Sequence, residues 1–364
     1  MKIILLLPDQ ISKFSVLYNV YHDLYLGLKY LNFDVEIIEI KKNVKTAGFP
    51  YMNLKNIQIN NLEDFILKNI KDDTYFVAAD DFDIMQELAN TGKIQNFLIW
   101  AHYFYGHRFI FKRYRQIDPV FNNNIKDIMA NKFIEYMPQS INFIKSKFYY
   151  NALSNNFVVS QSLWTALLIE RVYSIPIMGI LKIPVNPDIY DLNLNSERKN
   201  VLIFLGNKLE TDLNSLFKTI ILLRKLYKNV ELDYFGDNGT GELFQKYYNI
   251  KLNYTGKLER KELSNAYNSH LLTVTPIYNG NFEMVPIQSL LCGTPVITYM
   301  QPFMEVTGDN LMIANINNAK EIENKIVRWE NIDIKIKEDI KKKILNEMDN
   351  KIIAKKLIEF LNEM

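Results

Sequence analysis

The sequence has little cysteine and few histidines, and this scarcity excludes several classes of protein. Cys292 is the single cysteine among 364 residues, so the chain has neither an internal disulfide framework nor a cysteine-based zinc cluster. The four histidines show no metal-ligand spacing, and they are His22, His102, His107 and His270. We therefore expect no bound metal and no cofactor, and we expect the protein to work in the reducing cytoplasm.

Long apolar runs are also missing. No stretch approaches the roughly 18 apolar residues of a membrane-spanning helix, because charged residues and histidines interrupt the apolar segment between residues 97 and 115. The N-terminal "MKIILLLPDQ" is too short for a secretion signal and lacks a small-residue cleavage site, so it is predicted to form a first buried strand.

Net charge is close to zero, since 43 Lys and Arg face 41 Asp and Glu, for a formal charge of +2. The chain therefore lacks the large positive field that proteins binding nucleic acid usually have, and no nucleic-acid partner is expected. With 48% hydrophobic and 23% charged residues, the composition suits a globular protein long enough for two domains.

Short apolar runs alternate with longer helical patterns along the chain, which predicts parallel sheets covered by helices. In the first half, strands are expected at Ile3–Leu7, Val35–Ile40, Tyr75–Ala79, Phe97–Ala101 and Phe157–Ser160, with helices over 18–31 and 162–173. The alternation stops at a polar segment with two prolines and restarts in five strands within 201–206, 230–236, 250–256, 271–276 and 294–299. Both halves are therefore predicted to be doubly wound α/β units.

These patterns divide the chain into four parts. Residues 1–183 form a first Rossmann-like domain, 184–199 a linker, 200–331 a second Rossmann-like domain, and 332–364 a helical tail. The tail has apolar residues at spacings of three and four among lysines and glutamates. Two interpretations remain open for it: a segment that crosses back onto the first domain, or a solvated terminal helix.

The second domain resembles a known family through four fragments that follow one another in order and spacing. They are "VLIFLGNK", "LDYFGDNGTGELFQKYY", "NYTGKLERKELSNAYNSHLLTVTP" and "SLLCGTPVI". Together they resemble the nucleotide-binding half of retaining glycosyltransferases of family 4 (glycosyl transferases group 1). The resemblance implies the GT-B fold, in which two Rossmann-like domains face a central cleft.

In that family a loop after the strand ending near Pro276 carries one glutamate, and a second glutamate follows on the helix, with seven residues between the two. The resemblance implies that the first contacts the donor sugar and the second the ribose hydroxyls. Counting back from Cys292, these positions hold Gly280 and Gln288, so both acids are missing. Glu283 has two interpretations: a carboxylate that serves the sugar, or an acid that complements the helix dipole.

The diphosphate is expected to lie on backbone N–H groups of Gly280, Asn281 and Phe282 at the helix start. Lys208, close to Gly206 after the first strand of the domain, is expected to neutralise the diphosphate, the alternative being a solvated turn residue.

Two further regions complete the nucleotide and acceptor sites that the resemblance implies. Lys257 and Leu258 match the family's loop beside the nucleotide base. Asp9 and Gln10 stand where the family has a glycine-rich loop.

His102, at the end of a predicted strand, matches a cleft histidine near the acceptor, with a hydrogen-bonded structural group as the alternative. The segment 102–115 mixes aromatic and basic residues; it suits an acceptor or a membrane surface, or is a solvated amphipathic segment. The acidic run from Asp80 to Asp83 is read as a helix N-cap.

The resemblance implies an enzyme that transfers a sugar from a nucleotide-sugar donor to a hydroxyl of a glycan, lipid-linked or protein acceptor, with retention and without a metal. A location in the cytoplasm, with peripheral contact at the inner membrane face, fits such acceptors. One alternative is a degenerate GT-B protein that binds a nucleotide or acts as a scaffold subunit, which the missing acids at 280 and 288 favour. A sugar epimerase of the same fold would need further acid and base residues that the sequence does not reveal.

Overall fold

The computed structural model divides the chain into two compact units. Unit 1 comprises Met1–Gly106, Ile134–Asn186 and Glu347–Met364, and unit 2 comprises His107–Phe133 and Pro187–Asn346. The structure describes residues 1–8, 16–41, 55–58, 62–91, 94–102, 138–193, 197–206, 211–277, 283–299 and 302–364.

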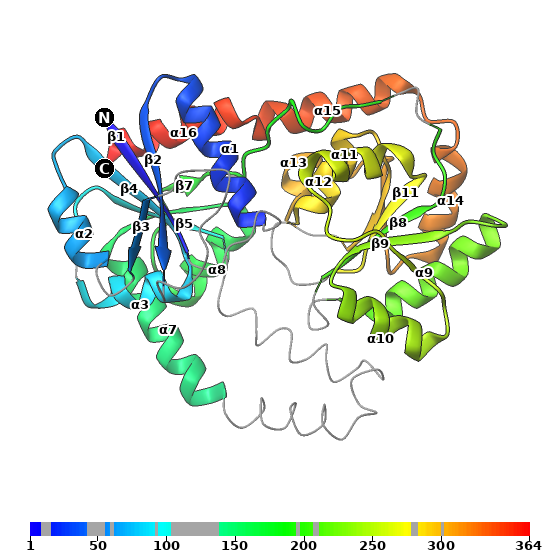
Figure 1. Ribbon diagram of the computed structural model, residues 1–364, viewed down its shortest axis with the longest axis horizontal. Coiled ribbons are helices and arrows are strands. Elements are labelled where there is room, and N and C mark those ends of the chain that lie inside the picture. The colour runs from blue at the N-terminus through cyan, green and yellow to red at the C-terminus, as the bar shows by residue number, and fades with distance from the viewer. Residues whose placement is uncertain are drawn as a thin grey trace. The chain divides into compact units, whose positions relative to one another are not determined.

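Unit 1 is built on a parallel sheet whose described strands follow the order β3-β2-β1-β4-β5-β6-β7 (Figure 1). The strands are β1 (Lys2–Leu7), β2 (Asp34–Lys41), β3 (Lys55–Gln58), β4 (Thr74–Ala79), β5 (Phe97–Ala101), β6 (Phe157–Ser160) and β7 (Gly179–Ile180). The central strands β4 and β5 are almost entirely buried, as expected for a sheet covered on both faces.

Helices cover both faces of this sheet. They are α1 (Val16–Tyr30), α2 (Leu62–Asn69), α3 (Phe82–Thr91), α7 (Pro138–Asn155), α8 (Leu163–Tyr173) and α16 (Asn350–Glu363). Side chains of α2, α3, α7 and α8 share one apolar core with the strands. The C-terminal helix α16 packs against α1, where a Cβ on Gly27 would lie 2.2 Å from the Asn350 carbonyl oxygen. Only glycine permits this approach of the two helices.

Unit 2 repeats the same plan with described strands in the order β10-β9-β8-β11-β12-β13, all parallel. The strands are β8 (Val201–Leu205), β9 (Leu232–Gly236), β10 (Asn253–Tyr254), β11 (Leu272–Thr275), β12 (Val296–Thr298) and β13 (Ile313–Asn315). This is the strand order of the dinucleotide-binding folds, with a reversal between β8 and β11.

The helices of unit 2 form a layer on each side of its sheet (Figure 1). One layer contains α9 (Leu213–Leu226), α10 (Asn238–Tyr248) and α14 (Ala319–Trp329), whose apolar residues form the core with the strands. The other contains α11 (Arg260–Ser269), α12 (Met284–Leu291) and α13 (Met304–Thr307). The chain then continues into α15 (Ile334–Met348).

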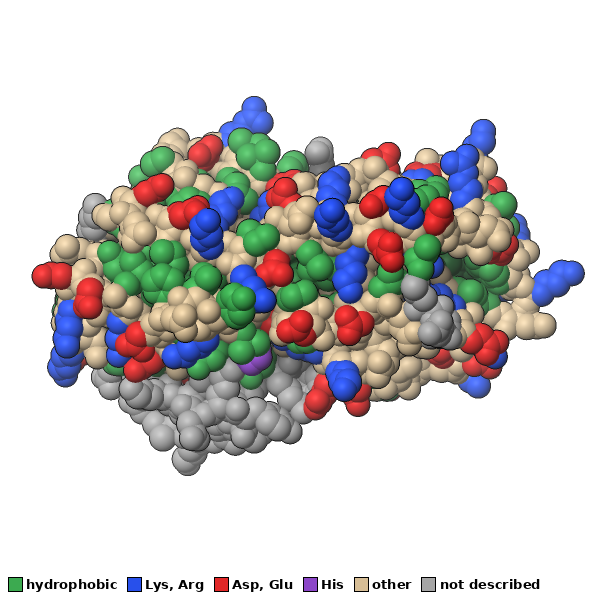
Figure 2. Space-filling model, turned by 90° about the horizontal axis from the view of Figure 1, so that it is seen from above, with side chains coloured by type: hydrophobic (Ala, Val, Ile, Leu, Met, Phe, Trp, Pro, Cys, Tyr) green, Lys and Arg blue, Asp and Glu red, His purple; other side chains and the backbone are tan. Residues whose placement is uncertain are grey.

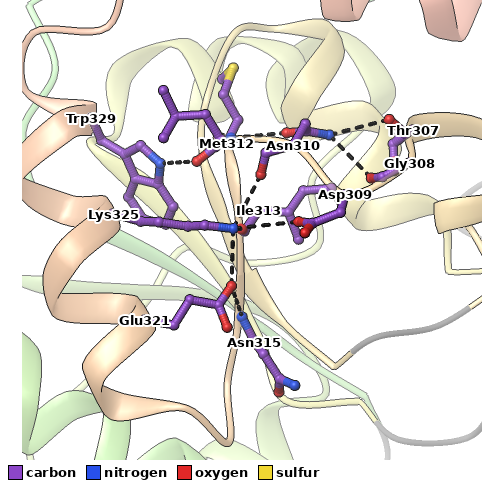
Figure 3. A network of polar contacts seen from close by, with 11 residues as sticks. Thr307, Gly308, Asp309, Asn310, Met312, Ile313, Asn315, Glu321, Lys325 and Trp329 are labelled. Carbon is purple, nitrogen blue, oxygen red and sulfur yellow. Dashed lines mark hydrogen bonds and ion pairs between the residues drawn. The ribbon is translucent and has the colours of Figure 1, made fainter.

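A network of polar contacts fixes the loop between α13 and β13 to helix α14 (Figure 3). Lys325 Nζ donates to the carbonyl oxygens of Ile313 at 2.5 Å and Asn310 at 3.3 Å, and lies 3.0 Å from Glu321 Oε1. Trp329 Nε1 donates to the carbonyl oxygen of Leu311 at 2.6 Å. Side chains of α14 therefore donate hydrogen bonds to carbonyl groups of the loop and of the first residue of β13.

The predicted α/β architecture is confirmed, with differences at the sheet edges. The strand predicted within 250–256 pairs only at Asn253 and Tyr254, and the polar edge strand β3 is additional. The helical tail forms two helices, because Asp349 accepts a hydrogen bond from Lys351 N at 2.8 Å and begins α16.

No helix in the described part of the chain is both long and apolar enough to cross a bilayer. Figure 2 shows acidic and basic side chains interspersed over the face that it presents, without a continuous basic area among the coloured side chains. This distribution agrees with the small net charge of the whole chain.

Candidate functional site

The carboxyl edge of the unit 2 sheet, at the reversal of strand order between β8 and β11, is the candidate site. The chain leaves β8 toward α9 on one face and leaves β11 toward α12 on the other (Figure 1). Such a divergence opens a crevice at the strand ends, which is where open α/β sheets bind ligands.

Backbone pairing joins the two loops that leave this point. Thr211 forms an antiparallel bridge with Ile277, and Asp212 N donates to the carbonyl oxygen of Pro276 at 2.8 Å. The Asp212 carboxylate also accepts from Ser215 N at 2.9 Å and so caps α9. The end of the loop after β8 is therefore fixed to the start of the loop after β11.

A third loop meets the same carboxylate. The hydroxyl of Tyr299, which follows β12, donates to Asp212 Oδ2. Two buried threonines lie at the carboxyl ends of neighbouring strands, Thr275 on β11 and Thr298 on β12. They are partners in the strand register. Their hydroxyls have no hydrogen-bond partner in the described part of the chain. The edge therefore holds two buried polar groups beside the loops that the resemblance assigns to the donor.

Gln288 lies on α12 with only 9% of its surface exposed. Its Oε1 accepts a hydrogen bond from the Tyr267 hydroxyl at 3.2 Å. Burial, followed by the nearby Tyr190, Cys292 and Glu283, raises the pKa of Tyr267 well above its usual value, so the hydroxyl stays protonated and remains a donor. Because the amide oxygen is engaged, Gln288 keeps its N–H group for any further partner.

Glu283 is the residue at which α12 begins, and its side chain makes no capping hydrogen bond to the helix. Its backbone is extended, so it precedes the first turn rather than lying in it. Its negative charge is close enough to contribute to the raised pKa of Tyr267. Glu283 and Gln288 are therefore parts of one neighbourhood around Tyr267.

The glycines that end the predicted strands differ in what surrounds them. A Cβ on Gly236, at φ +103°, would lie 2.2 Å from the carbonyl oxygen of Leu205, so the close neighbour is strand β8 itself. Gly256, at φ +92°, has open space around it. Gly206 accepts a hydrogen bond from the Thr211 hydroxyl at 3.1 Å. After β10, exposed Lys257 and half-buried Leu258 precede the capping box that begins α11.

Several predicted residues lie outside the described ranges. They are Asp9, Gln10, Lys208, Gly280, Asn281, Phe282 and the segment 103–115. In the sequence, Lys208 lies between Gly206 and Thr211, and Gly280 to Phe282 lie between Ile277 and Glu283. Those assignments stay predictions.

In unit 1, His102 follows β5 and is 4% exposed. Burial lowers its pKa to about 3, partly opposed by a side-chain hydrogen bond with Gln161, so the imidazole is neutral at neutral pH. Its ring lies 4.4 Å from the Trp100 ring, centroid to centroid, and 6.4 Å from that of Tyr21. Its Nε2 has no hydrogen-bond partner among the described residues. A neutral ring keeps one N–H donor and one nitrogen acceptor, so it can donate or accept a hydrogen bond without carrying a charge.

The Asp80 carboxylate holds the backbone of His102 in place, a role that the sequence analysis did not identify. One oxygen accepts from His102 N at 2.7 Å and the other from the Tyr149 hydroxyl at 2.8 Å. The side chain is fully buried after β4. No group of three or more His, Cys, Asp or Glu side chains in the described ranges is placed to hold a metal ion.

Comparison with known proteins adds a family match over unit 2. Residues 199–331 match the family model described as glycosyl transferases group 1. A search of curated proteins gives no significant match. The matched residues contain the six described strands of the unit 2 sheet and the reversal of strand order between β8 and β11.

Solved structures resemble the chain over its whole length. A sucrose-phosphate synthase from Thermosynechococcus elongatus aligns with a TM-score of 0.68 and 13% identity, covering 100% of this chain and 99% of that one. A glycosyltransferase from Rickettsia africae ESF-5 aligns at 0.63 with 16% identity, covering 100% and 98%. An α-glucosyltransferase in complex with UDP and a 13-mer DNA aligns at 0.61 with 9% identity, covering 100% and 99%. The chain has the GT-B fold.

Proposed function

We propose that the protein is a glycosyltransferase that moves a sugar from a nucleotide-sugar donor to an acceptor hydroxyl. The observation that carries this proposal is the match of residues 199–331 to glycosyl transferases group 1, over the segment that builds the crevice between β8 and β11. The α-glucosyltransferase of similar fold that binds UDP supports a nucleotide donor for this chain.

The donor is proposed to lie across the carboxyl edge of the unit 2 sheet. Lys208 and the backbone at the start of α12 would take the diphosphate, since a helix N-terminus and a lysine both favour a dianion. Gln288, its oxygen held by Tyr267, would donate its N–H to a ribose hydroxyl. Lys257 and Leu258 would border the base through their main chain.

Glycosyl transfer passes through an oxocarbenium-like state while negative charge develops on the leaving diphosphate. A fixed cation beside that diphosphate stabilises the transition state more than the ground state. We propose retention, with the leaving diphosphate helping to deprotonate the acceptor, and Glu283 as the carboxylate that serves the sugar. The anomeric configuration of the product, determined by NMR, tests retention, and an unchanged rate in excess EDTA tests metal independence.

The direct test is a thermal-shift screen over nucleoside diphosphates and their sugars. A ligand at about 100 times its dissociation constant adds about 2.7 kcal/mol to the free energy of unfolding. For a unit of this size that is a shift of about 5 to 10 °C. The nucleotide that binds then selects the donor for a transfer assay. No shift with any common nucleotide at millimolar concentration would refute the donor site.

A second candidate is a degenerate GT-B protein that binds a nucleotide or acts as a scaffold subunit. The residues Gly280 and Gln288, where the family has glutamates, favour it. Nucleotide binding without either transfer or hydrolysis of any donor sugar would support this second candidate over the enzyme.

The acceptor side is proposed to lie in unit 1. His102, neutral and with an Nε2 that has no partner among the described residues, would donate or accept a hydrogen bond to the acceptor. The segment 102–115 is proposed to contact a glycan, lipid-linked or protein acceptor, or the inner membrane face, in a cytoplasmic protein. Co-sedimentation with anionic vesicles tests the membrane contact.

A further inference from the structure

Two cations approach one loop at the opposite edge of the unit 2 sheet from the candidate site. Arg198 precedes β8, and Lys337 lies in the first turn of α15. Both reach the loop Cys292–Thr294, which connects the end of α12 to the start of β12. Because this loop enters the amino end of β12, the pair is separated from the donor loops by the length of the strands.

The contacts of the two side chains converge on Gly293. Arg198 donates from Nη2 to the carbonyl oxygen of Cys292 at 2.8 Å and from Nη1 to the Thr294 hydroxyl. A Cβ on Gly293 would lie 2.2 Å from Leu192 Cδ1 and 3.2 Å from Lys337 Cδ, so the lysine stem and Leu192 both lie against the loop at that residue. Arg198 therefore holds the loop on both sides of the residue that Lys337 covers.

The two charges repel one another. Burial lowers the pKa of Arg198, and burial together with the charge of Arg198 lowers the pKa of Lys337. Neither side chain forms an ion pair in the described part of the chain. Among the described residues, the Arg198 guanidinium uses two of its five N–H groups in hydrogen bonds. A half-buried pair of like charges without a counterion is a cost to the free protein.

Nearby acidic residues are paired with other lysines. Asp191 lies 3.7 Å from Lys341 Nζ, which also donates to the carbonyl oxygen of Tyr190 at 3.0 Å. Glu197 pairs with Lys199 at 2.8 Å on the exposed surface. The two acids closest in sequence to Arg198 therefore do not neutralise it.

We propose that Arg198 and Lys337 form a binding site for a phosphate-type oxyanion, separate from the nucleotide site. The guanidinium supplies a planar fork of donors and the ammonium a compact charge, a combination that suits inorganic phosphate or a terminal phosphate monoester. Two single positive charges match a phosphate dianion. The ligand would contact the loop at the end of α12, the helix that carries Gln288.

The test titrates sodium phosphate against the full chain at constant ionic strength, with chloride as the balancing anion, by calorimetry and thermal unfolding. Lys337→Met removes the charge but keeps a stem over Gly293, and Lys335→Met is its matched control on the exposed side of the same helix. We expect phosphate to raise the Tm of the wild type and of Lys335→Met equally. We expect Lys337→Met to bind phosphate about tenfold more weakly or worse.

The stability in chloride alone separates a ligand site from a structural cation. Lys337→Met is expected to be at least as stable as the wild type there, because the repulsion with Arg198 is gone. A lower Tm in chloride, or a phosphate response equal to that of Lys335→Met, would overturn the proposal. So would displacement of phosphate by a saturating nucleoside diphosphate, because that result would place phosphate in the donor site.

The source of the phosphate is distinguished by a vesicle arm. Co-sedimentation with vesicles containing phosphatidic acid, lost in Lys337→Met, would identify a lipid headgroup as the ligand. Phosphate binding without co-sedimentation would identify a soluble phosphate compound. If the protein neither binds free phosphate nor co-sediments with the vesicles, the proposed site is refuted.

Discussion

Gln288→Glu restores a carboxylate where the amide now meets Tyr267, and the surrounding contacts make it a sharp test of the donor site. The Tyr267 hydroxyl donates to Gln288 Oε1, so one oxygen of the introduced carboxylate is expected to accept the same hydrogen bond. The second oxygen replaces the amide N–H and becomes an acceptor for a ribose hydroxyl. The substitution therefore exchanges a neutral donor for a charged acceptor at one position.

The expected gain follows from the difference between hydrogen bonds to neutral and to charged groups, about 0.5–1.5 and 1.5–3 kcal/mol. A gain of about 1 kcal/mol corresponds to about fivefold tighter binding of a ribonucleoside diphosphate. The free protein should lose about 1–3 kcal/mol of stability, because a carboxylate 9% exposed loses most of its hydration. Burial raises the pKa of the introduced carboxyl, so the gain in affinity should increase from pH 6 to pH 8.

Calorimetry with ribonucleoside diphosphates and their 2′-deoxy analogues measures the effect. Gln288→Ala should weaken the ribose form more than the deoxyribose form, and Gln288→Glu should widen the preference for ribose. Tyr267→Phe is the control for positioning: it removes the bond to Oε1 and should reduce the preference without abolishing binding. Equal losses for the ribose and deoxyribose forms in Gln288→Ala would show that Gln288 does not contact the ribose.

Three further predictions concern other residues. Lys208→Ala should weaken binding of a nucleoside diphosphate more than binding of the nucleoside, measured by calorimetry; equal affinity of variant and wild type for the diphosphate would assign Lys208 to a solvated turn. Lys325→Met should lower the free energy of unfolding by about 2–3 kcal/mol in urea, because carbonyl and carboxylate oxygens lose a charged donor (Figure 3). Exposed Lys320→Met, on the same helix, should change it by less than about 0.5 kcal/mol. The pKa of His102 is about 3 when folded and about 6.5 when unfolded, so the unfolded chain binds the additional proton between these values. Stability should therefore fall as pH falls through this window, by up to about 1.4 kcal/mol per pH unit, and urea titrations from pH 6 to 4 should show a shallower slope in His102→Asn.

The buried strands could be predicted because their residues are apolar on both faces. Phe97–Ala101 and Phe157–Ser160 match β5 and β6 to the residue. The edge strands were poorly predicted, since β3 has the sequence KNIQ and β10 pairs over only two residues. An edge strand is covered on fewer sides, so the apolar pattern that indicates a strand is weak there.

The candidate site was predicted only as far as local order along the chain allows. The sequence places His102 at a strand end, but Asp80, which holds its backbone, is 22 residues away. Gln288 was found by counting along a familiar loop, whereas Tyr267 lies 21 residues earlier on another helix. Arg198 was treated as part of a polar linker, and its contacts with the loop after α12 depend on the folded sheet. Pairs of this kind arise from packing between elements, which a single sequence does not specify.

The hydrogen bonds at the switch point explain how a donor site can tolerate the loss of acidic side chains. The bridge between Thr211 and Ile277 and the Asp212 carboxylate, shared with Tyr299, join three loops through groups that need not touch a ligand. A nucleotide that binds mainly through backbone N–H groups and one lysine requires those loops to hold their spacing more than it requires any one carboxylate. Because the leaving diphosphate itself carries most of the developing charge, the proposed reaction depends first on this spacing. We therefore expect the residues Gly280 and Gln288 to reduce the affinity for the ribose more than they reduce the rate of sugar transfer.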